Sequence, residues 1–344
     1  LFEKTIFLSL EKMKKISARF SYSYQDNFDK IGRKNKSSDN WEKSKETIIW
    51  KASTLYSTGT NALSINYTRT DIDSRTGDEE DNRFDRAEIS SNHSLFDNSV
   101  SMNNYYELKN IEFYPKVREL QYVGESAGQY DSTGVFLENG GWDWVMTTLG
   151  ESEMTVEVNA DVSLFLKPGF LVKNKESHLL KKIQSETRIN VSENSRTGNK
   201  YKIYFLQPDY LMNKQTTIYG RQYLKHTFWL DILKNELLAE TSYSSDVTMD
   251  NRYQTEEKNR KTLAEIGLKI LSARNIKYEL RYESSNEKNS HYNSVIDNKM
   301  YTGEAKYSWQ NQIINNIKIS YSSEDGQRED QTRNYKLTRW GIAN

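Results

Sequence analysis

The feature that most constrains the fold is the strict alternation of apolar and polar residues between Arg260 and Ser285. Successive side chains of an extended strand point to opposite faces, so a period of two residues predicts a strand with two unlike faces. An α-helix needs apolar residues three and four positions apart and would scatter these around its circumference. The stretch therefore predicts an antiparallel hairpin that turns at residues 272–275. Its apolar face carries Thr262, Ala264, Ile266, Leu268, Ile270, Ile276, Tyr278, Leu280 and Tyr282.

The opposite face of this hairpin is ionic. Rows of acidic and basic residues can form cross-strand ion pairs when the face that carries them meets water. We therefore expect one wet face and one apolar face. The candidates for the wet face are Glu265, Lys269, Lys277, Glu279, Arg281 and Glu283.

Most of the chain repeats this pattern in looser form. Residues 200–225 are ambiguous: Tyr201 to Leu206 reads as a strand, but counting it as a full crossing breaks the parity of the later turns. We interpret this segment as a long hairpin or bulge that projects past the rim. The other alternating segments are 4–10, 16–24, 47–56, 63–67, 86–96, 100–108, 156–166, 183–191, 228–232, 237–243, 301–309, 317–321 and 335–340.

The connections fall into two alternating classes. One class consists of short turns, and the other consists of long, polar and charged loops that lie between those turns. The segment 167–181 is an exception, because it takes the place of a short turn but is too long for one. The longest interruption, 111–152, is predicted to be a loop insertion into one barrel or barrel segment that spans 1–344. The short breaks lie near Lys12, Gly59, Asp97, Asn235, Ala273 and Asn311.

Composition excludes several classes of protein. The 344 residues include 48 basic and 48 acidic side chains, and this balance argues against a nucleic-acid partner. Cysteine is absent, which excludes disulfides and cysteine-held metals. No apolar run approaches eighteen residues, so a helical membrane span is excluded. Because the sequence begins without Met and in mid-strand, we expect a mature or partial chain.

Three features favour a membrane barrel over a soluble sheet. The expected strands of roughly nine to eleven residues match a tilted membrane crossing, and short turns that alternate with long loops are typical of outer-membrane barrels. Aromatic residues cluster near strand ends, as an interfacial girdle requires. The fold prediction is an all-β, antiparallel transmembrane β-barrel of about 14 or more strands, with short turns on one side and long loops on the other. The girdle candidates are Trp50, Tyr56, Tyr67, Tyr282, Tyr301 and Trp309.

As a pattern over nearly its whole length, the chain resembles the outer-membrane β-barrel proteins of diderm bacteria. The stretch 122–144, with Tyr122-Val123-Gly124, Tyr130-Asp131 and Asn139-Gly140-Gly141, resembles insertions of very large barrels such as the type 9 secretion translocon. It departs from them at Phe136 to Glu138, where those insertions carry a denser run of Gly, Asn and Asp. The resemblance implies the bacterial outer membrane, with the lipid bilayer and other outer-membrane or periplasmic proteins as partners. A segment of a longer barrel would explain both ends of the chain.

The sequence holds no convincing catalytic or metal site. No two of the four histidines have metal-ligand spacing, and the acidic stretch from Asp71 to Asp81 lacks the spacing of a calcium loop, so a solvated charge run is favoured. Glu265 and Glu279 could form the acid and base of a lipase-like barrel, but no nucleophile is identifiable, and salt-bridged lumen residues are the better interpretation. We predict no enzyme activity, no metal and no cofactor. The histidines are His93, His178, His226 and His291.

The functional hypothesis is a barrel that acts as a pore, a translocation channel or a scaffold. Its six ionic residues would line the lumen, and a sheath around a partner's cytochrome is one variant. Aromatic residues of the long loop would bind partner proteins; Trp142 and Trp144 could instead stack on a sugar or cap the barrel. The alternative is a soluble or surface-attached all-β adhesion or carbohydrate-binding protein, and a hydrolase is a third option. The loop candidates are Tyr122, Tyr130, Trp142 and Trp144.

Overall fold

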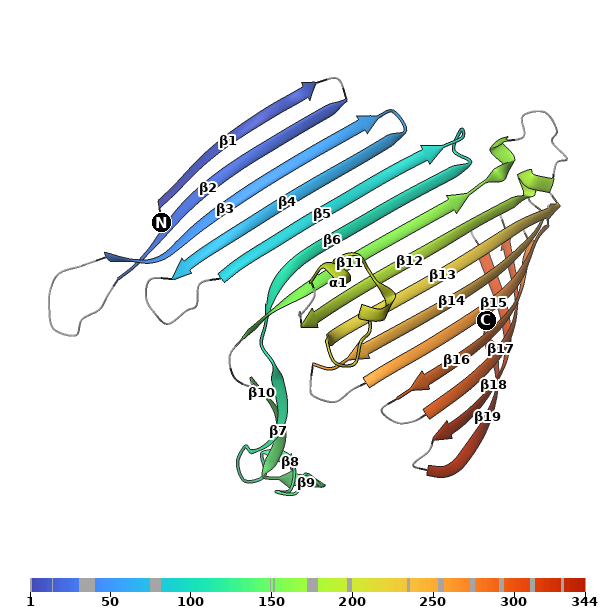
Figure 1. The fold of residues 1–344 in the computed structure, drawn as a ribbon. Helices are drawn as coiled ribbons and strands as arrows, with labels where there is room; N and C mark the ends of the chain where they lie inside the picture. The colour runs from blue at the N-terminus through green and yellow to red at the C-terminus, as the bar shows by residue number, and fades with distance from the viewer. Residues whose placement is uncertain are drawn as a thin grey trace.

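The protein, described here by a computed structural model, is built almost wholly from antiparallel strands (Figure 1). Fifteen of them form one large sheet, here called the wall, and the other four form a separate sheet, here called the side sheet. The expected fold class is confirmed: the chain is all-β and its wall has the up-and-down strand order of β-barrels. The structure describes residues 2–13, 15–30, 41–74, 82–148, 150, 152–171, 179–196, 200–233, 236–252, 257–272, 276–290, 294–309, 313–328 and 331–343.

The wall follows the chain strand by strand. Each strand pairs with its neighbour in sequence, except that β6 pairs with β11 because the side sheet lies between them in the chain. Among the described strands β1 pairs only with β2 and β19 only with β18. The strands of the wall are β1 (Phe2–Met13), β2 (Ile16–Lys30), β3 (Trp41–Thr58), β4 (Asn61–Ser74), β5 (Asn82–Leu95), β6 (Val100–Phe113), β11 (Glu153–Leu166), β12 (Ile183–Arg196), β13 (Thr217–Leu233), β14 (Leu237–Asp250), β15 (Glu257–Ser272), β16 (Ile276–Asn289), β17 (Ser294–Trp309), β18 (Ile313–Arg328) and β19 (Gln331–Ala343).

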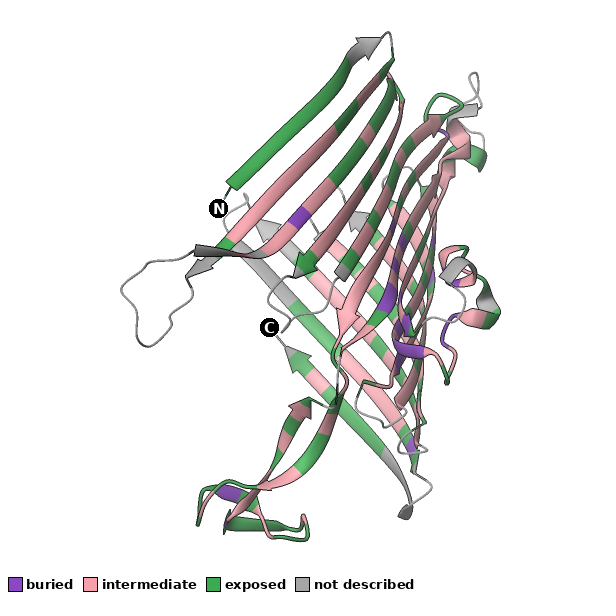
Figure 2. Ribbon diagram, turned by 60° about the vertical axis from the view of Figure 1, so that its left-hand side comes forward, coloured by how far each residue is buried: buried purple, intermediate pink, exposed green. Residues whose placement is uncertain are grey.

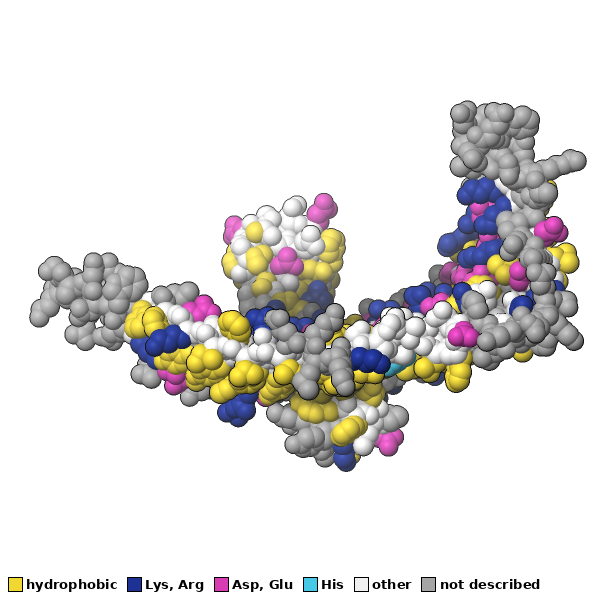
Figure 3. All heavy atoms as spheres, turned by 90° about the horizontal axis from the view of Figure 1, so that it is seen from above, with side chains coloured by type: hydrophobic (Ala, Val, Ile, Leu, Met, Phe, Trp, Pro, Cys, Tyr) yellow, Lys and Arg dark blue, Asp and Glu magenta, His cyan; other side chains and the backbone are white. Residues whose placement is uncertain are grey.

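The register gives the wall two chemically different faces. Ile266 of β15 lies opposite Tyr282 of β16 and Thr241 of β14, so these three side chains point to the same face. Followed from strand to strand in this way, the register places the apolar rows of all fifteen strands on one face. We call it the apolar face and the opposite one the polar face. Figure 3 shows hydrophobic side chains along the convex side of the wall, and acidic and basic side chains on the concave side where the wall bends. The alternation in the sequence is thus realised over the whole wall.

The strands are longer than the nine to eleven residues expected. The longest, β3, has 18 residues, and none of the wall strands is shorter than the 12 residues of β1. The expectation was wrong because apolar alternation stops before the strand does. Beyond the apolar rows the ladder continues with ionic residues, such as Lys43 of β3, whose Nζ lies 2.6 Å from Asp26 Oδ1. Parts of the segments 26–44 and 73–85, which show no apolar alternation, are therefore strand.

The short turns lie at one end of the wall and most long connections lie at the other. At the turn after β5, Phe96, Asp97 and Asn98 have positive φ values of 53°, 54° and 68°, as a tight turn requires. The exceptional segment 167–181 contains the short 3-10 helices η1 (Pro168–Leu171) and η2 (Leu179–Lys182). The expectation that every connection at the other end is long was wrong, because β16 ends at Asn289 and β17 begins at Ser294.

Residues 200–216, here called the strap, fold back over the apolar face. The predicted strand at 201–206 is instead part of a short helix, α1 (Lys200–Tyr204), and a 3-10 helix, η3 (Pro208–Tyr210), follows. The strap does not project past the rim as expected, because Ile203 packs with Val156 and Val158 of β11 into a buried apolar cluster. Figure 2 shows buried residues gathered in the middle of the wall beside this segment. Among the described residues no helix is long and apolar enough to cross a membrane.

The side sheet lies within the segment 111–152 and extends beyond the end of the wall (Figure 1). Its strand order is β7-β10-β8-β9. Two glycines allow its strands to cross closely: a Cβ on Gly128 would lie 2.1 Å from the Trp142 carbonyl oxygen, and one on Gly140 would lie 2.2 Å from that of Tyr130. Its strands are β7 (Lys116–Tyr122), β8 (Gly128–Tyr130), β9 (Phe136–Gly140) and β10 (Trp142–Thr148).

Candidate functional site: an ionic wall and an aromatic side sheet

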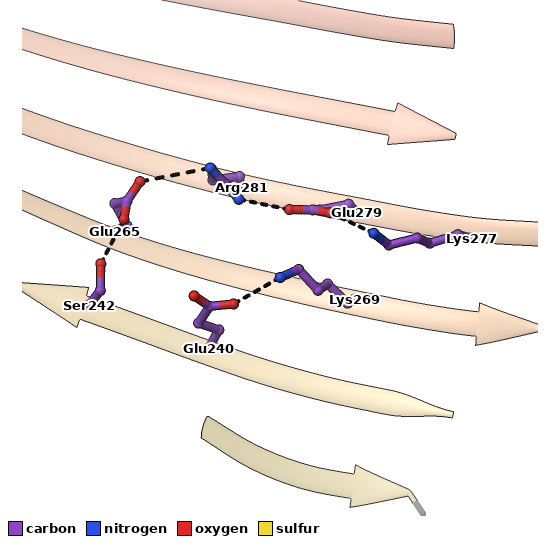
Figure 4. Close-up of polar contacts among 7 residues, drawn as sticks. All are labelled: Glu240, Ser242, Glu265, Lys269, Lys277, Glu279 and Arg281. Atoms are coloured by element: carbon purple, nitrogen blue, oxygen red, sulfur yellow. Dashed lines mark hydrogen bonds and ion pairs between the residues drawn. The ribbon is translucent and has the colours of Figure 1, made fainter. Parts of the chain in front are cut away.

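Five of the six predicted ionic residues lie together on the polar face of β15 and β16 (Figure 4). Arg281 stands at the centre, where its partner in the register is Gly267. The guanidinium reaches two carboxylates. Its Nη2 lies 2.9 Å from Glu279 Oε1, and its Nη1 lies 3.8 Å from Glu265 Oε1. Arg281 is thereby held between carboxylates from two strands.

Two lysines complete the network. Lys277 Nζ lies 3.4 Å from Glu279 Oε2, and Lys269 Nζ lies 2.8 Å from Glu240 Oε2 of β14. Ser242 Oγ also donates a hydrogen bond of 2.6 Å to Glu265 Oε2. Sequence reasoning missed Glu240 and Ser242, although the alternation of Glu240, Ser242 and Ser244 along β14 carries the same signal.

The network balances its own charge. Its three carboxylates each meet at least one of its three cations, so it presents hydrogen-bonding groups to water without a large net field. Glu283, the sixth predicted residue, lies opposite Glu265 in the register, and no ion pair joins it to another described residue of the network. Glu265 and Glu279 both contact Arg281, which is the arrangement of salt-bridged carboxylates. Such a surface can bind polar solutes by hydrogen bonds and ion pairs.

Ion pairs extend along the polar face into the middle of the wall. Arg86 Nε of β5 lies 2.8 Å from Glu107 Oε1 of β6, and Lys109 Nζ of β6 lies 2.8 Å from Glu157 Oε1 of β11. Arg221 Nη2 of β13 lies 2.7 Å from an Asp246 carboxylate oxygen of β14. The polar face is thus lined with ion pairs from β5 to β16.

The four aromatic residues predicted in the loop come together in the side sheet. The register places Trp142 opposite both Tyr122 and Tyr130, and the rings of Trp142 and Tyr122 are 5.6 Å apart. Trp144 lies two residues further along β10, so it shares the face of Trp142. The guanidinium of Arg118 lies 5.2 Å from the centre of the Trp144 ring. These residues form one aromatic face.

That aromatic face has little cover. Tyr122 is 57% exposed, Phe136 is 67% exposed and Trp144 is 38% exposed. Sequence reasoning missed Phe136, whose ring meets Tyr130 edge-on at 6.1 Å. Exposed apolar patches often mark contact sites, so the aromatic face is a candidate contact surface.

A second feature that sequence reasoning missed is the carboxyl group of Glu193. It is fully buried on the apolar face, where the strap covers it. Ser195 Oγ donates to Glu193 Oε1 at 2.7 Å, Thr217 Oγ1 also donates to Oε1, and the Met212 amide donates to Oε2 at 3.2 Å. These contacts join the strap to β12 and β13. The only sequence signal is one acidic residue in the row of Ile189 and Val191.

The remaining candidates do not form a site among the described residues. No group of three metal-ligating side chains occurs in the described part of the chain. His226 Nδ1 lies 2.8 Å from Thr187 Oγ1, and His93 lies on β5, well separated along the wall. Asp71 is held by Arg69 and Arg83, at 3.0 Å and 2.7 Å. The remaining histidines and acidic residues considered as ligands lie outside the described residues: His178, His291, Asp78, Glu79, Glu80 and Asp81.

Comparisons with known proteins give distant likenesses. No protein-family model matches the chain, and no curated protein matches it. Among solved structures it is similar to the ferric-catecholate import receptor Fiu of E. coli K12 in its open form, with 8% identity, a TM-score of 0.36, and coverage of 99% of this chain and 63% of that one. It is also similar to the copper transporter OprC, with 11% identity, a TM-score of 0.38, and coverage of 98% and 60%. The chain spans less than two thirds of the length of each.

Proposed function

We propose that the wall is part of a β-barrel in the outer membrane of a bacterium, with its apolar face in lipid and its polar face lining an aqueous interior. The observation that carries this proposal is the exposure of the apolar face. Leu8 of β1 is 71% exposed, Ile266 of β15 is 60% exposed and Ile317 of β18 is 54% exposed. The exposure therefore occurs on strands far apart in the wall. Soluble proteins rarely expose contiguous apolar patches above a few hundred Å². Lipid is the solvent that such a face suits.

The apolar rows are also close in height to the apolar band of about 25 Å that outer-membrane barrels present to lipid. On β2 they run from Ile16 to Tyr24, which is about 27 Å along the strand and about 21 Å along the membrane normal at a tilt of about 40°. At the long-loop end the same face becomes ionic, with Arg69, Asp71 and Arg83. An apolar band of limited height with an ionic margin at the long-loop end supports a bilayer crossing.

Aromatic residues mark the band, as an interfacial girdle does. Tyr282, Tyr301, Tyr321 and Trp340 lie opposite one another on four successive strands. The rings of Tyr282 and Tyr301 are 4.9 Å apart, and those of Tyr321 and Trp340 are 4.6 Å apart. Amphipathic rings favour the boundary between lipid and water.

Within that setting we propose a role in passage or scaffolding without bond-making. The balanced ionic network of β14 to β16 would keep the interior hydrated and hold polar solutes by hydrogen bonds. The candidate roles of Glu265, Lys269, Lys277, Glu279, Arg281 and Glu283 are therefore those of lumen residues.

The membrane proposal is tested by extraction and gel mobility. Native membranes are washed with carbonate and then with detergent, and the extract is run on a gel with and without heating. The expected result is protein that stays in the carbonate pellet, needs detergent and migrates anomalously until boiled. Release by carbonate would overturn the proposal and favour the soluble adhesion or carbohydrate-binding alternative. Conductance in planar bilayers then distinguishes an open pore from a plugged scaffold.

We further propose that the aromatic face of the side sheet binds a partner protein through a segment rich in Arg and Lys. Residues 116–148 contain five acidic and two basic side chains, so they favour a cationic partner. The contact between Arg118 and Trp144 is an internal example of the expected interaction.

The partner proposal is tested with two synthetic peptides, one alternating Arg and Leu and one alternating Glu and Leu. The Arg peptide is expected to bind, and W144A or F136A to weaken it about tenfold, which corresponds to about 1.4 kcal/mol. T147A changes the opposite face of β10 and is the matched control. Equal binding of both peptides, or an equal loss in T147A, would exclude the proposed partner chemistry.

A further inference from the structure

The polar face of β2, β3 and β4 differs from the ionic network because its cations lack acidic partners. On this face the residues of 17–25, 47–57 and 62–72 include Arg19 and Lys51 but no Asp or Glu. Most of the others are Ser, Thr, Asn or Gln. No ion pair joins Arg19 or Lys51 to a described residue, whereas Lys269, Arg281 and Arg86 each contact a carboxylate. This region therefore carries uncompensated positive charge.

The register brings the two cations close enough to share a ligand. Arg19 lies opposite Ser53 and Lys51 lies opposite Ser21, so the two cations are diagonal neighbours on the same face. Diagonal neighbours have Cα atoms about 7–8 Å apart, which both long side chains can bridge. The guanidinium of Arg19 also lies 5.6 Å from the centre of the Phe7 ring. That contact limits the positions of the guanidinium without neutralising it.

The wall is hollowed beside Arg19, and Lys51 lies one row further along β3. A cavity of about 470 Å³ is lined by Phe7, Arg19, Ser53, Leu55 and Asn66, among others. Its lining combines a cation with hydroxyl and amide groups and with two apolar surfaces. A solute with an anionic group and several hydroxyls matches these features, because sites for such ligands combine a few oriented polar groups with apolar walls.

We propose that the polar face of β2 to β4 is a binding site for small hydroxylated anions, such as sugar phosphates. The guanidinium of Arg19 donates paired hydrogen bonds to phosphate or carboxylate oxygens, and Lys51 adds a point charge. Ser53 and Asn66 bind the hydroxyl groups, and Phe7 and Leu55 contact the carbon skeleton. This site rests on the proposed function only in requiring that the polar face is open to water.

The test is calorimetric titration of the detergent-solubilised protein at low ionic strength with glucose 6-phosphate, inorganic phosphate and glucose. Glucose 6-phosphate is expected to bind most tightly, phosphate more weakly, and glucose not measurably. The double variant R19Q/K51Q is expected to lose at least about tenfold in affinity for glucose 6-phosphate, as loss of charge-assisted hydrogen bonds implies. R19K is expected to retain part of the affinity.

The matched control is K225Q, which removes a cation from the same face at β13, outside the hollow. It is expected to bind glucose 6-phosphate like the unchanged protein. An equal loss in K225Q would show that general charge drives binding, and unchanged affinity in R19Q/K51Q would also overturn the site. If the double variant misfolds, as judged by circular dichroism, the single variants provide the same comparison. Binding in detergent is independent of the carbonate extraction, so either proposal can fail alone.

Discussion

Two regions of the apolar face carry similar side chains under different cover. Val158 is fully buried against Ile203 of the strap, and Ile218 and Met249, on neighbouring strands, are fully buried too. On β15 and β16, Ile266 is 60% exposed and Leu280 is 56% exposed. The covered region behaves as a protein core, and the uncovered region depends on the surrounding solvent. If the proposed membrane location holds, the strap takes the place of lipid over part of the apolar face, so mutations of one residue type should have different effects in the two regions.

The largest expected effect is at the buried carboxyl. Glu193→Ala would leave the Ser195 and Thr217 hydroxyls and the Met212 amide without their acceptor, at about 1–3 kcal/mol for each unsatisfied group. We expect the strap to detach and become a target for trypsin, and the midpoint of unfolding in urea to fall. The control is Glu265→Ala on the exposed polar face, where a lost surface pair costs about 0–1 kcal/mol. Equal effects of the two variants would contradict the comparison.

Truncating one isoleucine in each region tests whether the covered and the uncovered parts of the apolar face differ in packing. Ile218→Ala should destabilise the protein by about 2–5 kcal/mol, because it removes apolar contacts and leaves a cavity under the strap. Ile266→Ala should cost about 1–2 kcal/mol in bilayers, because mobile acyl chains fill the space and only the transfer term is lost. Urea unfolding in lipid vesicles measures both. If Ile266→Ala costs as much as Ile218→Ala, the exposed row is packed against protein.

A charge on the uncovered region tests the lipid contact directly. Leu280→Arg should cost about 2–4 kcal/mol in a bilayer, as a cation on the lipid face does near the midplane. The matched control is Ser90→Arg, on the polar face of β5, which should assemble normally. Assembly is measured as the fraction that shows heat-dependent gel mobility in vesicles. Normal assembly of Leu280→Arg would place this row in water.

The smallest expected effect concerns the side sheet, whose aromatic face is exposed. Hydrogen bonds from the Thr133 hydroxyl and the Val135 and Thr133 amides lower the pKa of Asp131 below its usual value. A lowered folded-state pKa contributes stability above the unfolded-state value, and this stability is lost as the pH falls through the folded-state pKa. We expect the turn at 131–135 to loosen in acid, as measured by hydrogen exchange. Asp131→Asn should remove this dependence on pH.

Sequence reasoning succeeded where alternation is dense. The row from Val156 to Leu166 predicts both the strand β11 and the face that its apolar side chains share. Every second residue in this row is apolar, and a shift of one residue would move the whole row to the other face. The turn at Asp97 and Asn98 follows from residues that tolerate positive φ. The ionic network followed from cross-strand charge rows, although its members on β14 were missed.

Failures occurred where tertiary contacts override the local pattern. Tyr201 to Leu206 has the composition of a strand, yet it forms a helical turn because Ile203 is buried against β11. No alternation marks the polar ends of β2 and β3, since ionic ladders hold them. The burial of Glu193 depends on a segment that folds back over it, which no single-strand pattern indicates.

The nearest-neighbour order of the wall has a kinetic consequence. Every pairing except that of β6 with β11 joins strands linked by one connection, so the sheet can grow hairpin by hairpin at a small entropic cost of loop closure. The β6–β11 pairing must instead enclose the whole side sheet before its first bond forms. We expect this pairing to form slowly, so that the segments β1–β6 and β11–β19 each form first and pair with one another last.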